Sequence, residues 1–225
     1  MQIPRRAVLA RQLCGLNDTR IIGRMRWILI VALSLFFLFS CIGIETEITI
    51  DDDGSGEITL SYKVSRLVIH LGTLEEDRPF FAVPVSRQDF DDITESVPGL
   101  RLRSFDMDED ASDVFVDATL AFDDIDALNA LFGSNGRSSI TLSRSGGRTV
   151  YKHVIYEGNG EEVNDDSRKM VEALFSDYAL RFSLTAPDDI STVSHGIVSG
   201  RNATIEHTIA EVIDLREPLV WEISW

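Results

Sequence analysis

The side chains best suited to chemistry are few and widely spaced in this 225-residue chain. Its histidines, His70, His153, His195 and His207, have no i,i+4 histidine partner, and no Cys-x-x-Cys pair accompanies them, so the sequence does not support a zinc site. The serines form neither a Gly-x-Ser-x-Gly elbow nor a Ser-x-x-Lys motif with its partner motifs. No phosphate-binding glycine pattern occurs either. We therefore expect no metal and no other cofactor.

One acidic segment has the spacing of a calcium loop. Asp51-x-Asp53-x-Ser55-Gly56 matches the first positions of an EF-hand, in which alternate oxygen ligands surround the ion. The twelfth position, which needs a bidentate acid, is Tyr62, and both flanks alternate like strands instead of forming helices. The alternative is a hairpin turn in which Gly54 and Gly56 supply positive φ. We favour the turn.

Carboxylates could still form a catalytic pair that only the folded geometry would reveal. The acidic clusters all fall at expected helix starts or strand turns, where solvated acids are common. We therefore expect no enzymatic activity and no catalytic residues. The clusters are Asp89/Asp91/Asp92, Asp106/Asp108/Glu109/Asp110 and Asp123/Asp124/Asp126.

Charge is distributed unevenly along the chain. The whole sequence has 37 acidic and 21 basic residues, a net charge of −16. Residues 1–40 contain six arginines and one acid, a balance of +5, which leaves −21 for residues 41–225. Nucleic-acid binding requires basic clusters that displace counterions, so we expect no nucleic-acid partner. The two parts of the chain must occupy different environments.

A short apolar run in the basic part predicts a targeting segment. Trp27–Phe39 contains neither a charge nor a proline and comes directly after Met25-Arg26. These are the dimensions of a signal peptide, over 25–40, and are short of a spanning helix. An uncleaved anchor is the alternative. Because a leading region that began at Met1 would be long for a signal peptide, we expect 1–24, with Cys14, to be an over-extended start and Met25 to be the initiator.

The end of this run resembles a bacterial lipobox. Leu38-Phe39-Ser40-Cys41 has an aliphatic residue at −3, a small residue at −1, and then cysteine. The resemblance implies that the Cys41 thiol accepts a diacylglyceryl group and that a peptidase cleaves after the small Ser40. Two or more acyl chains hold a protein stably on a membrane. The expected partner is thus the membrane, through Cys41.

The remaining residues, 41–225, are expected to form a single acidic α+β domain. The sheet should be mainly antiparallel and should carry three or four short helices. Ile44–Ile50 and Ile58–Val64 read as a hairpin, and Ser86 with Asp89 three residues later predicts a capped helix. Up to residue 144 the elements follow the β-α-β-β-α-β order of ferredoxin-like cores. The further strands are expected at Leu100–Met107, Asp113–Phe122, Ser139–Arg144, Thr149–Tyr156, Tyr178–Thr185, Asn202–Glu206 and Leu219–Trp225, with helices near 123–132, 167–177 and 209–215.

The connection Arg66–Val85 is long for a compact domain. It contains Phe80 and Phe81 between two prolines, which would make an apolar contact loop if they were exposed. The alternative, which we favour, is that this loop folds onto the core.

Taken together, these patterns resemble bacterial envelope lipoproteins and, more loosely, the LppM-like family. The matching residues are Leu38–Cys41, Ile44–Ile50, the Asp53-Gly54-Ser55-Gly56 turn and Glu57–Val64. The chain ends at Trp225 without the apolar C-terminal anchor that LppM-like proteins can carry, so Cys41 is the only expected anchor.

The resemblance implies no catalytic residues. It implies a lipoprotein of the bacterial cell envelope, on the periplasmic or surface face, that bears palmitate or a similar acyl group. We expect a structural or protein-interaction role with an envelope protein or lipid as partner. The alternatives are a lipid- or amphiphile-binding carrier and a hydrolase with unrecognised carboxylates.

Overall fold

The computed structural model describes residues 43–66, 69, 84–133, 139–158, 160, 165–175 and 178–225. All of them belong to one compact unit, Cys41–Trp225. No helix among the described residues is long and apolar enough to cross a membrane.

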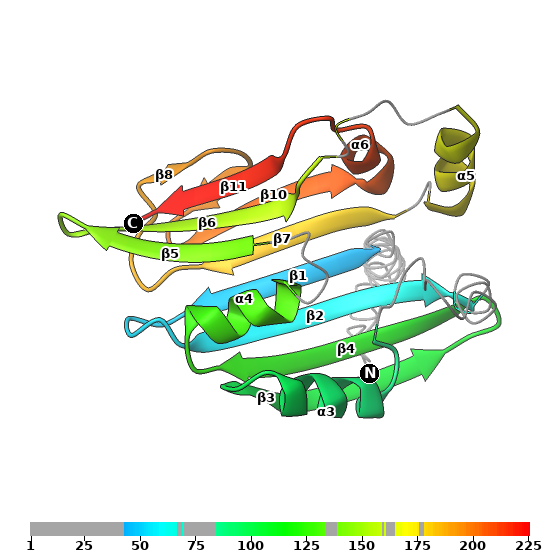
Figure 1. Ribbon diagram of the computed structural model, residues 1–225, viewed down its shortest axis with the longest axis horizontal. Coiled ribbons are helices and arrows are strands. Elements are labelled where there is room, and N and C mark those ends of the chain that lie inside the picture. Colours follow the sequence, from blue (N-terminus) through cyan, green and yellow to red (C-terminus); the bar gives the residue numbers. More distant parts are fainter. Residues whose placement is uncertain are drawn as a thin grey trace, which may run out of the picture. The chain divides into compact units, whose positions relative to one another are not determined.

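Two sheets make up most of the described unit (Figure 1). Within the described residues, each strand pairing is antiparallel except that of β1 with β7. The seven-stranded sheet contains, in spatial order, β3 (Leu100–Glu109), β4 (Asp113–Phe122), β2 (Gly56–Ser65), β1 (Ile44–Ile50), β7 (Ala179–Thr185), β10 (Asn202–Thr208) and β9 (Ile197–Ser199). The four-stranded sheet contains β5 (Ser139–Ser145), β6 (Arg148–Tyr156), β11 (Leu219–Ser224) and β8 (Thr192–Val193).

Within the described residues, four short helices accompany the sheets, so the expected α+β class is confirmed. The first, α3, begins with the expected capping box: Ser86 accepts a hydrogen bond from the Asp89 N–H, and the Asp89 carboxylate accepts one from the Ser86 N–H. Asp124 caps α4 by accepting from the Ala127 N–H at 2.8 Å. The helices are α3 (Arg87–Ser96), α4 (Ile125–Gly133), α5 (Asp165–Phe175) and α6 (Ile209–Ile213).

The ferredoxin-like core is not confirmed. Three of its four strands have the expected neighbours, because β3, β4 and β2 lie in that order. The fourth position, beside β2, is occupied by β1, whose short turn makes it the natural partner of β2. The strand expected there, β5, pairs with β6 in the other sheet. The last third of the chain contributes to both sheets.

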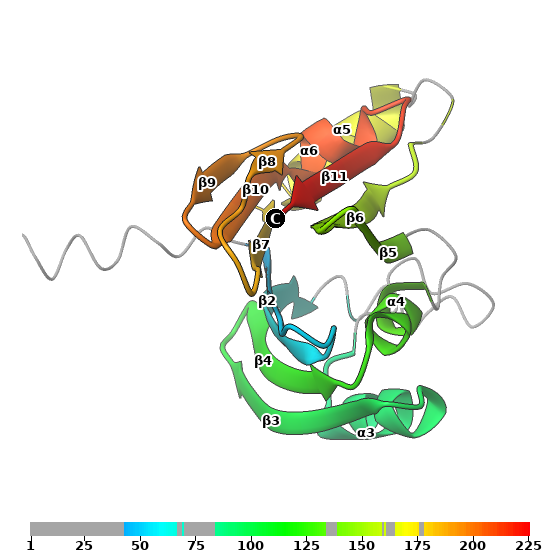
Figure 2. The same cartoon turned by 90° about the vertical axis from the view of Figure 1, so that its left-hand side faces the viewer.

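The two sheets enclose a common core. Figure 2 shows β5, β6, β11 and α4 on the concave side of the seven-stranded sheet. Ile58 and Leu184 of the large sheet belong to the same buried cluster as Tyr151 and Trp221 of the small one. Alternate residues of β1, β2 and β4 point into this cluster, and the residues between them point to the opposite, outer face.

The β1–β2 turn is the hairpin that the sequence predicts. The Asp51 N–H donates to the Ser55 carbonyl at 2.8 Å, and Gly54 has a φ of +94°. The expectation that Gly56 also has positive φ is wrong. Gly56 is required because a Cβ there would lie 1.9 Å from the Thr49 carbonyl oxygen and 2.6 Å from the Phe122 ring.

Candidate functional site

The outer face of the large sheet carries polar and charged side chains in cross-strand rows. In one row Ser61 donates to Asp117 at 2.5 Å, and Arg181 bridges Glu45 and Glu206 at 3.4 and 2.7 Å. In the next, Thr59 meets Thr119 and Ser183 meets Thr204 through their hydroxyls. The side chains named in these rows are thus satisfied by their neighbours.

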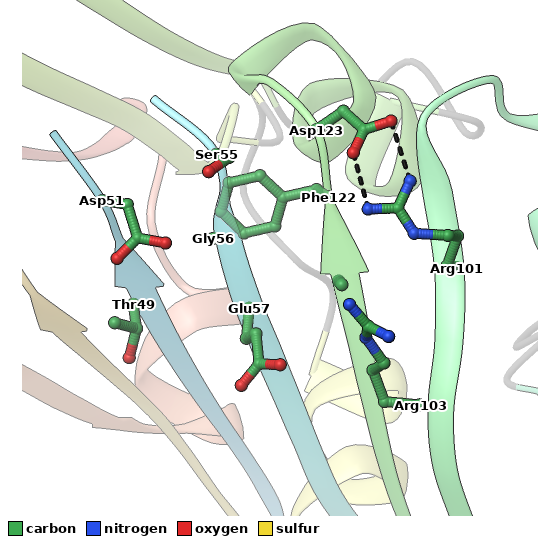
Figure 3. Close-up of a pocket in the computed structure, with 10 residues that line it drawn as sticks. Thr49, Asp51, Ser55, Gly56, Glu57, Arg101, Arg103, Phe122 and Asp123 are labelled. Carbon is green, nitrogen blue, oxygen red and sulfur yellow. Dashed lines mark hydrogen bonds and ion pairs between the residues drawn. The ribbon is translucent and has the colours of Figure 1, made fainter. Parts of the chain in front are cut away.

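A pocket of about 280 Å³ opens on this face, at the end of the sheet where the β1–β2 turn lies (Figure 3). This size is at the lower limit for ligand sites and suits a small molecule. Its lining is mostly charged and hydroxyl-bearing. The lining residues are Thr49, Asp51, Ser55, Gly56, Glu57, Arg101, Arg103, Ala121, Phe122 and Asp123.

The row of residues at this pocket has a small side chain at its centre. The register places Ala121 of β4 between Glu57 of β2 and Arg101 of β3. Ala121 is only 4% exposed although it points to the outer face, so the longer side chains around it shield it. Because adjacent strands are about 4.8 Å apart, the backbones of the flanking strands are separated by about 10 Å. The short alanine between them forms the floor of the pocket.

Arg103 lies on the same face, at a β-bulge. The register of β3 against β4 shifts between Leu102 and Ser104, which leaves Arg103 as the extra residue. The bulge allows Phe105 to point inward, where its ring lies 5.5 Å from that of Phe90. In Figure 3 the Arg103 side chain extends from β3 over β4, toward the strand that carries Glu57. Bulges commonly redirect side chains at binding sites.

Arg101 is held by an acid at the pocket's rim. Its Nη1 and Nη2 donate to the two carboxylate oxygens of Asp123 at 2.8 and 2.6 Å, a bidentate pair. The hydrogen bond from Arg101 lowers the pKa of the Asp123 carboxyl, and the charges of Arg101 and Arg103 lower that pKa further. The pair fixes the position of Arg101 and neutralises most of its charge.

Three other charged groups at the pocket have no such partner. Among the described residues, Arg103, Glu57 and Asp51 have no side-chain hydrogen bond and no ion pair within 4 Å. Arg103 is on the β3 side, whereas Glu57 and Asp51 are on the side of β2 and β1. The pocket therefore presents opposite charges on opposite walls, at groups that a ligand could contact.

The acidic turn beside the pocket does not have the ligand geometry of an EF-hand. Asp53 accepts hydrogen bonds from the Ser55 N–H and hydroxyl at 2.9 and 2.6 Å, and these bonds lower the pKa of its carboxyl. Tyr62, at the twelfth position, lies in β2 and donates to the Pro84 carbonyl. No cluster of three or more potential metal ligands occurs among the described residues.

None of the described histidines lines this pocket. His195 and His207 lie near the surface, and His153 is fully buried in the core. The Nδ1 of His153 is 3.2 Å from the Tyr151 hydroxyl, and its ring lies 5.1 Å from Phe132 and 5.3 Å from Phe182. Burial lowers the pKa of His153 to about 3. This histidine is a neutral core residue at physiological pH.

The site residues predicted from the sequence lie outside the described residues. These are the lipid-attachment residue Cys41, the lipobox residues Leu38, Phe39 and Ser40, and the apolar loop residues Phe80 and Phe81.

The sequence predictions did not include Arg101 and Arg103. Two signals for them were present. First, arginines two residues apart in a strand share a face. Second, the inward-facing residues of this strand are even-numbered up to Leu102 and odd-numbered from Phe105, which indicates a bulge between them.

Comparison with known proteins gives one structural similarity. No family model matches the chain, and no curated protein matches it. Among solved structures, the folded domain of the Mycobacterium tuberculosis LppM protein, determined by NMR, is similar at a TM-score of 0.43 and 14% identity. The similarity covers 82% of this chain and 88% of that one.

Proposed function

We propose that this protein is a non-enzymatic lipoprotein of the bacterial cell envelope, attached to a membrane through Cys41. Its acidic domain presents a polar binding site to another envelope component. The observation that carries the proposal is the start of the fold. The Gly43 carbonyl already accepts a hydrogen bond from the Lys63 N–H at 3.1 Å, and β1 follows at Ile44. Only Ile42 separates the lipobox cysteine from hydrogen-bonded structure.

This short tether holds one end of the sheet beside the membrane. Two residues of extended chain span at most about 7 Å, so the Gly43 end of the sheet stays close to the lipid. Strand β1 runs from there to Ile50, and the pocket begins at Thr49 and Asp51. At about 3.3 Å per residue, the pocket lies roughly 25 Å further along the strand. If β1 stands upright on the membrane, a site at this distance would meet a partner other than the anchoring lipid.

The lining of the pocket favours this role over a lipid carrier. A carrier for an acyl chain needs an apolar cavity, because each methylene that it removes from water contributes about 0.8 kcal/mol. The pocket described above is lined mainly by charged and hydroxyl side chains. A polar or charged ligand fits that lining better than an amphiphile does.

Lipid attachment can be tested by labelling with palmitate in a bacterial host. The wild-type chain should incorporate the label and accumulate as a precursor when globomycin blocks the lipoprotein signal peptidase. Cys41→Ala should abolish labelling. The matched control, Cys14→Ala, should leave it unchanged, because Cys14 precedes the expected initiator Met25. Labelling that persists in Cys41→Ala would refute the anchor.

A second variant tests the cleavage step separately. A small side chain at −1 is needed for the peptidase, so Ser40→Phe should still be labelled but remain at precursor mass. Processing of Ser40→Phe at the wild-type rate would contradict the lipobox assignment.

A further inference from the structure

We propose that the pocket at the turn end of the large sheet binds the zwitterionic form of a short peptide, with a free amino group and a free carboxylate. The inference rests on the binding role proposed above, but not on lipid attachment. It specifies the chemical class of the ligand from the charges on the two walls of the pocket.

Arg103 supplies the anion-binding wall. Its side chain is exposed, comes from a bulge and has no ion pair within the described residues. A guanidinium group matches the planar geometry of a carboxylate and can donate two parallel hydrogen bonds to it. Asp123 neutralises most of the charge of Arg101, so Arg103 is the main anion-binding group of this wall.

Glu57 and Asp51 supply the cation-binding wall. Glu57 is exposed on β2, and Asp51 follows the end of β1. Ser55 donates its hydrogen bonds to Asp53 and not to Asp51 or Glu57, so the carboxylates of Asp51 and Glu57 remain available to a ligand. An ammonium group has three donors and can satisfy one or both of them.

The separation of the walls sets the size of the ligand. The flanking backbones are about 10 Å apart, and the side chains shorten that gap. An extended dipeptide places its charged ends about 7 Å apart. Ala121 is short, so its row leaves a depression between the two walls, and because it is only 4% exposed the ligand contacts the longer side chains around it.

A zwitterionic lipid headgroup is less well matched. The phosphate and ammonium groups of phosphoethanolamine would also meet opposite charges in the pocket. However, only a two-carbon link separates these two groups, so they lie closer together than the charged ends of an extended dipeptide and span less of the gap between the walls. The peptide is therefore the ligand that the geometry favours.

The experiment is a titration of the full-length chain, in a mild non-ionic detergent, with L-alanyl-L-alanine. The amide NMR signals of Gly56 and Ala121 should shift saturably. The N-acetylated and the C-amidated dipeptides should each bind at least tenfold more weakly, because each lacks one charged group. A tenfold change corresponds to about 1.4 kcal/mol, near the lower limit for a hydrogen bond to a charged group.

Variants then assign each end of the ligand to a wall. Arg103→Gln should weaken binding of the free dipeptide about tenfold. In this variant the free and the C-amidated dipeptides should bind with equal affinity. In Glu57→Gln the free and the N-acetylated dipeptides should bind with equal affinity. Arg87→Gln, an exposed arginine on α3, serves as the matched control and should change neither. The blocked dipeptides test the same point on the wild-type fold, without relying on any variant.

Three outcomes would overturn the assignment. The first is the absence of saturable shifts at 20 mM dipeptide, and the second is equal binding of free and blocked dipeptides. The third is tighter binding of phosphoethanolamine than of the dipeptide, which would make the ligand a headgroup. Failure of palmitate labelling would remove the anchor and leave this titration unaffected, so failure of the two proposals can be distinguished.

Discussion

Lowering the pH from 7 to 5 should destabilise this domain by about 2 kcal/mol through one buried histidine. His153 is 0% exposed and packs among Phe132, Phe182 and Tyr151. Burial disfavours its protonated form and lowers its pKa from 6.5 to about 3. In the unfolded chain the same imidazole is solvated and returns to its ordinary pKa.

The sign and size of the effect follow from proton linkage. Between pH 6.5 and pH 3 the unfolded state binds a proton that the folded state does not, so stability falls as the pH falls. The stability contribution is fully present above pH 6.5, and its loss at pH 5 is about 2 kcal/mol, relative to a total of about 5 kcal/mol. Most carboxyl groups are still ionised at pH 5, which makes this window specific to histidine.

Urea denaturation at pH 7 and pH 5, followed by tryptophan fluorescence, to which the buried Trp221 contributes, measures the effect directly. His153→Gln should abolish most of the pH dependence, whatever it does to stability at pH 7. His195→Gln, which removes an exposed histidine, is the matched control and should retain that dependence. Equal wild-type stability at the two pH values, or an unchanged dependence in His153→Gln, would refute the reasoning.

Three further predictions test the hairpin and the first helix. Gly56→Ala should cost more than about 2 kcal/mol of stability, because its Cβ would meet the Thr49 carbonyl. Gly147→Ala, with open space around it but a φ of +78°, should cost only about 1 kcal/mol in the same thermal melts. Ser86→Ala should cost about 1 kcal/mol in urea denaturation by removing the capping box, and an unchanged midpoint would contradict this. Calcium at 1 mM should leave the melting temperature unchanged, and a calorimetric dissociation constant below 1 mM would overturn the assignment of Asp53 to a turn.

Local features of the fold could be predicted because they depend on neighbouring residues. The alternation of Ile44–Ile50 requires one buried face whichever strand lies beside it. The Ser86 capping box and the Asp124 cap satisfy N–H groups within three residues of themselves. The expected strands therefore agree with the structure to within a few residues.

The arrangement of the strands could not be predicted in this way. Strand β1 pairs in parallel with β7, which comes much later in the chain, and nothing in either alternation specifies that partner. A ferredoxin-like core would place β5 beside β2. That position was already occupied by β1, the nearest antiparallel partner in sequence. Pairing between distant strands is decided by the packing of the whole core.

The candidate site illustrates the same limit. Arg101 and Glu57 are far apart in the sequence, and only the register through Ala121 places them in one row. The sequence carries a signal for the bulge at Arg103. Leu100 and Leu102 point inward, and the next inward residue, Phe105, comes three residues after Leu102 and not two, so one extra residue must lie between them. Its role in a pocket required knowledge of the neighbouring strands.

Net charge gives a further reason to expect a zwitterion at this pocket. Residues 41–225 carry −21, and the pocket itself has three acids against two arginines. Charges beyond about 8 Å are largely screened at physiological ionic strength, so the nearby groups dominate. A simple anion must approach a pocket with a net charge of −1 to reach Arg103, and a simple cation meets that arginine when it reaches Glu57. A zwitterion has no net charge and can satisfy both walls at once, so its affinity should change little with salt.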